Sequence, residues 1–169
     1  MDRPGPVSDR ELRRKLTVRA HGQTLVLVKR PVESTEHVLQ KALLWALYLP
    51  DYPGLRVEVP LPGSSRYKPD LLAFDGERPV IWCECGVVSV AKLDALLPRY
   101  RATHFVFSKW GFSPHALDAF AGMIEAALCG VRRTAPVEMI GFDADSAAFI
   151  GDGGEIAISK RDVVIRRWD

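Results

Sequence analysis

The sequence has few of the residues that mark several common classes of protein. It contains three cysteines, four histidines and no asparagine in 169 residues. Three is an odd number of cysteines, and a chain of this length can fold by burying apolar side chains, so we expect reduced thiols and no disulfide framework. The four histidines are scattered along the chain, which argues against a histidine metal cluster and against a catalytic triad.

Long apolar runs and an excess of charge of one sign are also absent. The longest apolar stretches, such as residues 42–49, are far shorter than the roughly 20 residues that cross a bilayer, so we expect no membrane segment. The first fifteen residues lack the apolar core of a secretory signal, and we therefore expect a cytoplasmic protein. The net charge is only +2, so a site for a polyanion has to be a local feature.

The length and the hydrophobic content of 47% predict a single domain over residues 1–169, in which residues 1–15 form a flexible arm. Apolar residues at helical spacing predict helices over 34–49, 89–97 and 114–128. Alternating apolar residues between turn residues predict a hairpin over 16–20 and 24–28, central strands over 55–59, 67–74, 80–86 and 104–108, and C-terminal strands over 137–142, 147–150, 155–158 and 162–166.

This order of elements predicts an α/β fold in which helices cover both faces of a mixed sheet. The strand over 80–86 is apolar on both faces, as in a strand buried from two sides. Glu84 lies within it. A buried ionised carboxylate costs several kcal/mol unless it is paired or bound to a metal, so Glu84 is a candidate site residue.

Asp70 is the second candidate, because the strands that carry Asp70 and Glu84 are expected to form a hairpin. A loop of five residues over 75–79 places the two side chains directly opposite each other on one face. A three-residue loop makes them diagonal neighbours, and an even-numbered loop without a bulge places them on opposite faces. Two facing carboxylates repel unless a cation lies between them, and their oxygens suit Mg²⁺ or Mn²⁺. Burial and repulsion should then raise the apparent pKa of the pair, chiefly at Glu84.

A helix with Glu36, then Pro69-Asp70, then Glu84-Cys85-Gly86 before another helix resembles the PD-(D/E)xK phosphodiesterase superfamily. Within it, the run over 30–36, the helix with Trp45, the run over 81–86 and the strand after Arg101 resemble the bacterial YaeQ family. The resemblance implies a restriction-endonuclease-like fold, a nuclease-type site and metal ligation by Asp70, Glu84 and Glu36, with Glu33 as the alternative to Glu36.

One position departs from that pattern. The superfamily has a lysine two residues after the strand acid, and this chain has Gly86 there. Lys92, in the first turn of the next helix, is our choice for the site lysine, and Lys68 is the competitor because it shares a strand face with Asp70. Such an ammonium would orient the attacking water and offset charge on the phosphate.

Two functions therefore follow as expectations. The first is a Mg²⁺-dependent phosphodiesterase that acts on nucleic acid, with Glu36, Asp70, Glu84 and Lys92 as catalytic residues. The second is a nuclease-fold relative that has lost catalysis and binds nucleic acid or protein, which Gly86 favours. A Lys92 that points toward the carboxylates supports the first function, and a Lys92 in solvent supports the second. Structural explanations compete with both, since Asp70 could serve a turn and Glu84 a buried ion pair.

Overall fold

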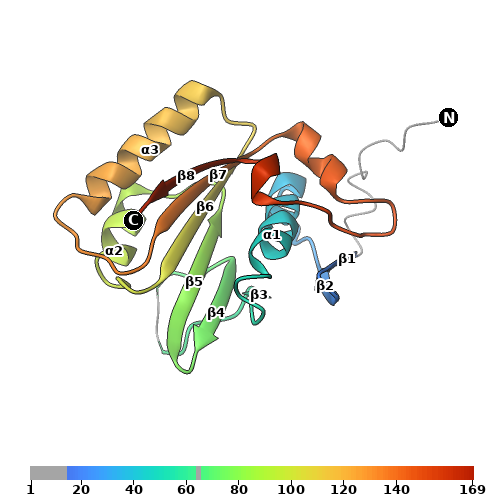
Figure 1. Ribbon diagram of the computed structural model, residues 1–169, viewed down its shortest axis with the longest axis horizontal. Coiled ribbons are helices and arrows are strands. Elements are labelled where there is room, and N and C mark those ends of the chain that lie inside the picture. Colours follow the sequence, from blue (N-terminus) through green and yellow to red (C-terminus); the bar gives the residue numbers. More distant parts are fainter. Residues whose placement is uncertain (1–14, 64–65) are drawn as a thin grey trace.

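The computed structural model of the chain describes residues 15–63 and 66–169 (Figure 1). Apart from Lys15, the expected N-terminal arm over 1–15 lies outside the described residues. Within the described residues, no helix has the length and the apolar character that crossing a membrane would require.

A six-stranded mixed sheet forms the centre of the fold, and its strands lie in the order β3-β4-β5-β6-β7-β8. Strands β3, β4 and β5 are antiparallel to one another, β5, β6 and β7 are parallel, and β8 returns antiparallel to β7. A separate hairpin joins β1 to β2. The strands are β1 Leu16–Ala20, β2 Gln23–Leu27, β3 Arg56–Val57, β4 Leu71–Asp75, β5 Arg78–Cys85, β6 His104–Trp110, β7 Val137–Phe142 and β8 Val164–Trp168.

Three α-helices cover the sheet, and each begins at a serine whose hydroxyl accepts a hydrogen bond from a backbone N–H in the first turn. The caps are Ser34, Ser89 and Ser113, and the third helix also has a proline in its first turn, where the missing N–H costs nothing. The helices are α1 Thr35–Tyr48, α2 Val90–Leu96 and α3 Pro114–Leu128. The expected helix starts at 34, 89 and 114 are therefore correct to within one residue.

Alternate residues of the central strands pack into two separate cores. Ile81, Cys83 and Cys85 face α1, whereas Trp82 lies among the side chains of α2 and α3. Strand β5 is thus buried on both faces, as its composition predicts. Because side chains alternate along a strand, Glu84 belongs to the α2–α3 face. The two buried cysteines on the α1 face are free thiols that fill the core.

The C-terminal segment differs from the expectation. The strand expected over 147–150 is the end of a 3-10 helix, Ala144–Phe149, which Asp143 caps. The strand expected over 155–158 makes only isolated bridges, from Glu155 to Arg19 and from Ile156 to Ile150. Aspartate and serine side chains that bond nearby backbone N–H groups offer this segment an alternative to a sheet ladder, which the alternating pattern alone does not show.

Candidate functional site

The hairpin of β4 and β5 brings Asp70 to the end of β5 by an unexpected route. Its turn has two residues, since Asp75 pairs with Arg78, and this even number alone would place the two acids on opposite faces. A β-bulge between Ala73 and Phe74 restores the register, so that Leu71 pairs with Cys83. Asp70 comes just before β4, and its N–H donates to the carbonyl of Cys83, the residue that Leu71 pairs with, at 3.0 Å. The regular pairing therefore ends before an Asp70–Glu84 pair is reached.

Glu84 is buried, and both its oxygens have donors on the α2–α3 face. The Trp82 indole N–H donates to Oε1 at 2.8 Å, and Lys92 Nζ lies 2.7 Å from Oε2. Burial raises the pKa of Glu84, the contacts with Lys92 and Trp82 oppose the rise, and the negative charge of Asp70 adds to it. The direction matches the expectation for two interacting carboxylates of which Glu84 is the more buried.

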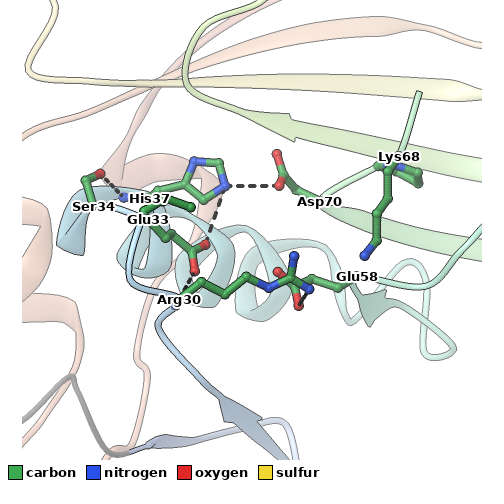
Figure 2. Close-up of a pocket in the computed structure, with 9 residues that line it drawn as sticks. Arg30, Glu33, Ser34, His37, Glu58, Lys68 and Asp70 are labelled. Atoms are coloured by element: carbon green, nitrogen blue, oxygen red, sulfur yellow. Dashed lines mark hydrogen bonds and ion pairs between the residues drawn. The ribbon is translucent and has the colours of Figure 1, made fainter. Parts of the chain in front are cut away.

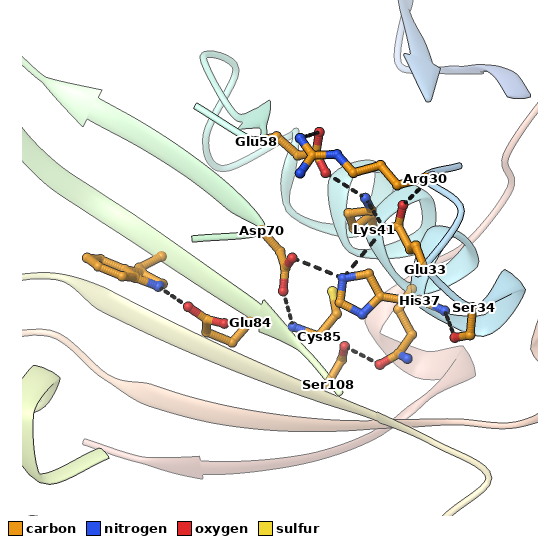
Figure 3. Close-up of polar contacts among 12 residues, drawn as sticks. Arg30, Glu33, Ser34, His37, Lys41, Glu58, Asp70, Glu84, Cys85 and Ser108 are labelled. Atoms are coloured by element: carbon orange, nitrogen blue, oxygen red, sulfur yellow. Dashed lines mark hydrogen bonds and ion pairs between the residues drawn. The ribbon is translucent and has the colours of Figure 1, made fainter. Parts of the chain in front are cut away.

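Asp70 is held from the other side of the sheet. Its Oδ2 accepts a hydrogen bond of 2.7 Å from the Cys85 backbone N–H, and its Oδ1 lies 3.0 Å from His37 Nε2 on helix α1 (Figure 3). The hydrogen bond with Asp70 raises the pKa of His37, and burial opposes it. The two carboxylates are therefore each paired with a basic side chain, Glu84 with Lys92 of α2 and Asp70 with His37 of α1.

A pocket of about 440 Å³ opens next to Asp70, between the start of α1 and the chain that leads into β4 (Figure 2). Its lining consists of Arg30, Val32, Glu33, Ser34, His37, Glu58, Lys68, Pro69 and Asp70. Buried Lys41 lies behind it and forms ion pairs with Glu33 and, at 3.1 Å, with Glu58.

Glu58 also lies 3.2 Å from Arg30 and adopts a φ of 56°. Left-handed backbone is rare for a residue other than glycine and clusters at functional sites. The pocket thus contains a strained residue and a continuous network of ionic contacts.

The predicted site residues are only partly brought together. Asp70 and Glu84 lie at the ends of neighbouring strands, and Lys92 points at Glu84 as the first of the two functions requires. The expected placement of both carboxylates on one face is not met by their contacts, because Asp70 contacts His37 of α1 and Glu84 contacts Lys92 of α2. Glu36 is exposed in the first turn of α1 and contacts neither carboxylate among the described residues. Its role as a ligand stays a prediction. Glu33 and Lys68, the two alternatives, both line the pocket.

Sequence reasoning missed His37 and Lys109. Lys109 lies on β6 beside Gly86 and donates to the Gly86 carbonyl. It is 2% exposed, and burial lowers its pKa to about 8, although Glu84 and Cys85 raise it. The signal for Lys109 was the one that identified Glu84, namely an ionisable residue inside an apolar strand. His37 had no such signal, because a residue near a helix N-terminus is usually exposed.

A lysine at position 86 would be strained in this structure, because the backbone of Gly86 has a φ of 86°. A Cβ added there would lie 3.7 Å from His37 Nδ1. The strand has ended at this residue, so the alternation that would aim a lysine along with Glu84 no longer applies.

We predict that Gly86→Lys lowers the free energy of unfolding by about 1–2 kcal/mol, the cost of left-handed backbone for an L residue, and brings no gain in catalysis. Urea melts and a nuclease assay check this. The control is Gly122→Lys, since that glycine lies in α3 with nothing near its Cβ. A Gly86→Lys variant of unchanged stability and raised activity would show that the position still accepts the motif lysine.

The two carboxylates have the hard oxygen donors that Mg²⁺ and Mn²⁺ prefer. All four of their oxygens accept from or pair with internal donors, and the described residues contain no group of three or more histidine, cysteine, aspartate or glutamate side chains arranged to hold a metal. Mg²⁺ is commonly held by one or two carboxylates together with water and substrate phosphate. Asp70 and Glu84 would fit that mode if both side chains turned toward one ion, away from His37 and Lys92.

Solved structures share this arrangement of elements. The YaeQ protein from Xanthomonas axonopodis pv. citri aligns with a TM-score of 0.54 at 19% identity, over 79% of this chain and 73% of that one. The chain has a YaeQ-like fold. The YaeQ protein from Pseudomonas syringae aligns with a TM-score of 0.52 at 15% identity, over 81% of this chain and 70% of that one. At these identities the likeness concerns the fold alone. No protein-family model matches the sequence, and no curated protein matches it either.

Proposed function

We propose that the chain is a metal-dependent phosphodiesterase of the PD-(D/E)xK kind, acting on nucleic acid. The observation that carries the proposal is the contact of 2.7 Å between Lys92 and Glu84, beside Asp70. An ammonium and two carboxylates at the end of a hairpin are the groups that phosphodiester hydrolysis with Mg²⁺ or Mn²⁺ needs. The YaeQ-like fold is compatible with this function and carries no activity by itself.

Each residue has a defined task in this proposal. Asp70 and Glu84 would hold the metal, which supplies polarisation of the phosphoryl oxygen. Lys92, whose side chain is 16% exposed, is free to turn from Glu84 toward the attacking water and the charge that develops on the phosphate. The Trp82 N–H and the Cys85 N–H keep one oxygen of each carboxylate oriented. These two hydrogen bonds would hold the carboxylates in position whether or not Lys92 has turned away from Glu84.

A second function, binding without catalysis, has one specific observation in its favour. The position of the motif lysine is a glycine in left-handed conformation, and both carboxylates are already paired within the protein. In that reading, Glu84–Lys92 and Asp70–His37 are structural ion pairs that hold α2 and α1 to the sheet. Turnover with added metal separates this function from the first.

Lys92→Gln tests the proposal, because the amide can still donate to Glu84 while the positive charge is lost. We expect the turnover of a labelled oligonucleotide with Mn²⁺ to fall by about 10²–10³-fold, since the ammonium acts in the transition state. Mn²⁺ affinity, measured by calorimetry, should change little. Lys160→Gln is the control, since Lys160 is an exposed partner of Asp51 at 3.0 Å. Wild-type protein that binds oligonucleotide but never cleaves it with Mg²⁺ or Mn²⁺ would establish the binding module instead.

A further inference from the structure

The pocket and the carboxylate pair meet at Asp70. Asp70 lines the pocket, whereas Glu84 is buried behind it on the α2–α3 face and does not. A ligand that reaches the pair from this pocket therefore passes His37 and Asp70 first. In Figure 2, His37 and Lys68 lie on two sides of Asp70, and the Lys68 side chain extends along the wall of the pocket.

Among the described residues that line the pocket, Lys68 is a cation without an ion-pair partner, so it is available to a ligand. Glu33 and Glu58 are neutralised by buried Lys41, and Glu58 also pairs with Arg30. Lys68 is exposed and has no carboxylate within ion-pair distance among residues 15–63 and 66–169. Asp70, the remaining acid of the lining, pairs with His37. An unpaired ammonium two residues from Asp70 is suited to an anionic group that lies next to the carboxylate pair.

His37 lies next to the place where a side chain at position 86 would begin. Its Nδ1 would be 3.7 Å from a Cβ on Gly86, and its Nε2 lies 3.0 Å from Asp70. The His37 imidazole therefore lies between Gly86 and the Asp70 carboxylate. Gly86 is the position at which the superfamily has its lysine. Its side chain is 28% exposed, so it is accessible from the pocket.

We propose that this pocket is the subsite for the phosphates of a nucleic-acid strand, with His37 contacting the phosphate next to Asp70 and Lys68 contacting a neighbouring one. This inference rests on the proposed function for the identity of the ligand. It adds the side of approach, which is the α1 side of the sheet, and two contacts that replace the lysine absent at position 86. Phosphate contacts of this kind position a strand and are insensitive to its sequence.

Lys68→Ala and Arg66→Ala form a matched pair that tests the subsite. Both side chains are exposed on the same segment, but Arg66 lies over the Tyr67 ring and does not line the pocket. Binding of a fluorescein-labelled single-stranded oligonucleotide is measured by anisotropy in EDTA, so that no cleavage intervenes. We expect Lys68→Ala to weaken binding by about 3–10-fold and to lower the slope of log K against log salt by about 0.7, the effect of one lost phosphate contact. Arg66→Ala should change neither. Equal losses in both variants, or none in Lys68→Ala, would overturn the proposal.

His37 and His115 form the second pair, because His115 is an exposed histidine of α3 that does not line the pocket. His37→Ala should weaken oligonucleotide binding, and His37→Gln should restore part of it because its amide nitrogen can reach the position of Nε2. His115→Ala should leave binding unchanged. A merely structural His37 would give equal binding in the folded Ala and Gln variants, which overturns its phosphate contact. Inorganic phosphate that displaces the oligonucleotide at micromolar concentration would mean a phosphate-ion site and overturn the assignment to a strand.

These outcomes are independent of the proposed function. If wild-type protein cleaves with Mn²⁺ while Lys68→Ala binds normally, the subsite is wrong and the phosphodiesterase stands. If binding depends on Lys68 but no metal supports cleavage, the subsite stands and the phosphodiesterase is wrong. If the wild-type protein binds no oligonucleotide, the subsite is wrong whatever the cleavage assay gives.

Discussion

Glu84→Gln is expected to abolish Mg²⁺- or Mn²⁺-dependent cleavage and metal binding while the free energy of unfolding stays within about 1 kcal/mol of wild type or rises. The reason is the raised pKa of Glu84, which means that burial and Asp70 oppose its charge more than Lys92 and Trp82 favour it. A neutral amide removes that charge, and its one oxygen can still accept from Trp82 or Lys92. Urea melts with and without Mn²⁺, together with calorimetry, measure the two effects.

The structural explanation of Glu84 makes the opposite prediction. If the contact with Lys92 is a buried ion pair that holds α2 in place, the substitution leaves a cation unpaired and costs about 3–5 kcal/mol. Glu125→Gln is the matched control, because Glu125 is an exposed acid of α3 that accepts a hydrogen bond from the Trp168 indole. A large loss of stability, combined with no effect of Mn²⁺ on the wild-type melt, would mean that Glu84 is a structural acid.

The burial of Glu84 could be predicted from the sequence because burial is encoded in composition. An acid in a strand that is apolar on both faces needs a partner, and that argument holds before any coordinates. The register of the hairpin could not be predicted in this way. The sequence leaves loops of five, three or an even number of residues open, and the structure combines a two-residue turn with a bulge between Ala73 and Phe74. The position of a bulge depends on how the two strands twist together, and this cannot be predicted from one sequence.

The contribution of helix α1 could not be predicted in the same way. Spacing places Glu36 and His37 in the same turn and gives no preference between them, because rotation of the helix about its axis is set by packing against the sheet. Eleven residues of α1 are buried, and that packing turns His37 toward Asp70 and leaves Glu36 exposed. The position of Lys92 near Glu84 could be predicted because the Ser89 cap fixes Lys92 in the first turn of α2, close to the end of β5. Its role as the site lysine stays a prediction.

A second buried polar cluster lies away from the candidate site, at the other end of β6, where His104 begins the strand. Glu138 of β7 accepts from Tyr48 at the end of α1, lies 2.9 Å from His104 Nε2 and pairs with Arg167 of β8 at 3.1 Å. Tyr52 and His104 are also hydrogen-bonded, at 2.9 Å. The Glu138 carboxylate of β7 thus makes polar contacts with residues of α1, β6 and β8.

Glu138 is expected to govern the acid stability of the fold. Burial alone would raise its pKa, but hydrogen bonds from His104 and Tyr48, with Arg167, hold the pKa at about 2. A carboxylate whose pKa is lower in the folded than in the unfolded chain stabilises the fold above its unfolded value of 4.5, and this stability is lost as the pH falls toward 2. The shift corresponds to roughly 3 kcal/mol.

Glu138→Gln should therefore lower the free energy of unfolding by about 3 kcal/mol at pH 7 and have little effect near pH 2, where the wild-type carboxylate is itself protonated. Urea melts of both proteins between pH 2 and pH 7 should converge at the acid end. Glu155→Gln is the control, because Glu155 is exposed and only 4.0 Å from Arg19, and its curve should follow the wild type throughout. A Glu138→Gln curve that stays parallel to the wild type down to pH 2 would mean that the cluster stabilises the fold through packing, with no contribution from the charge of Glu138.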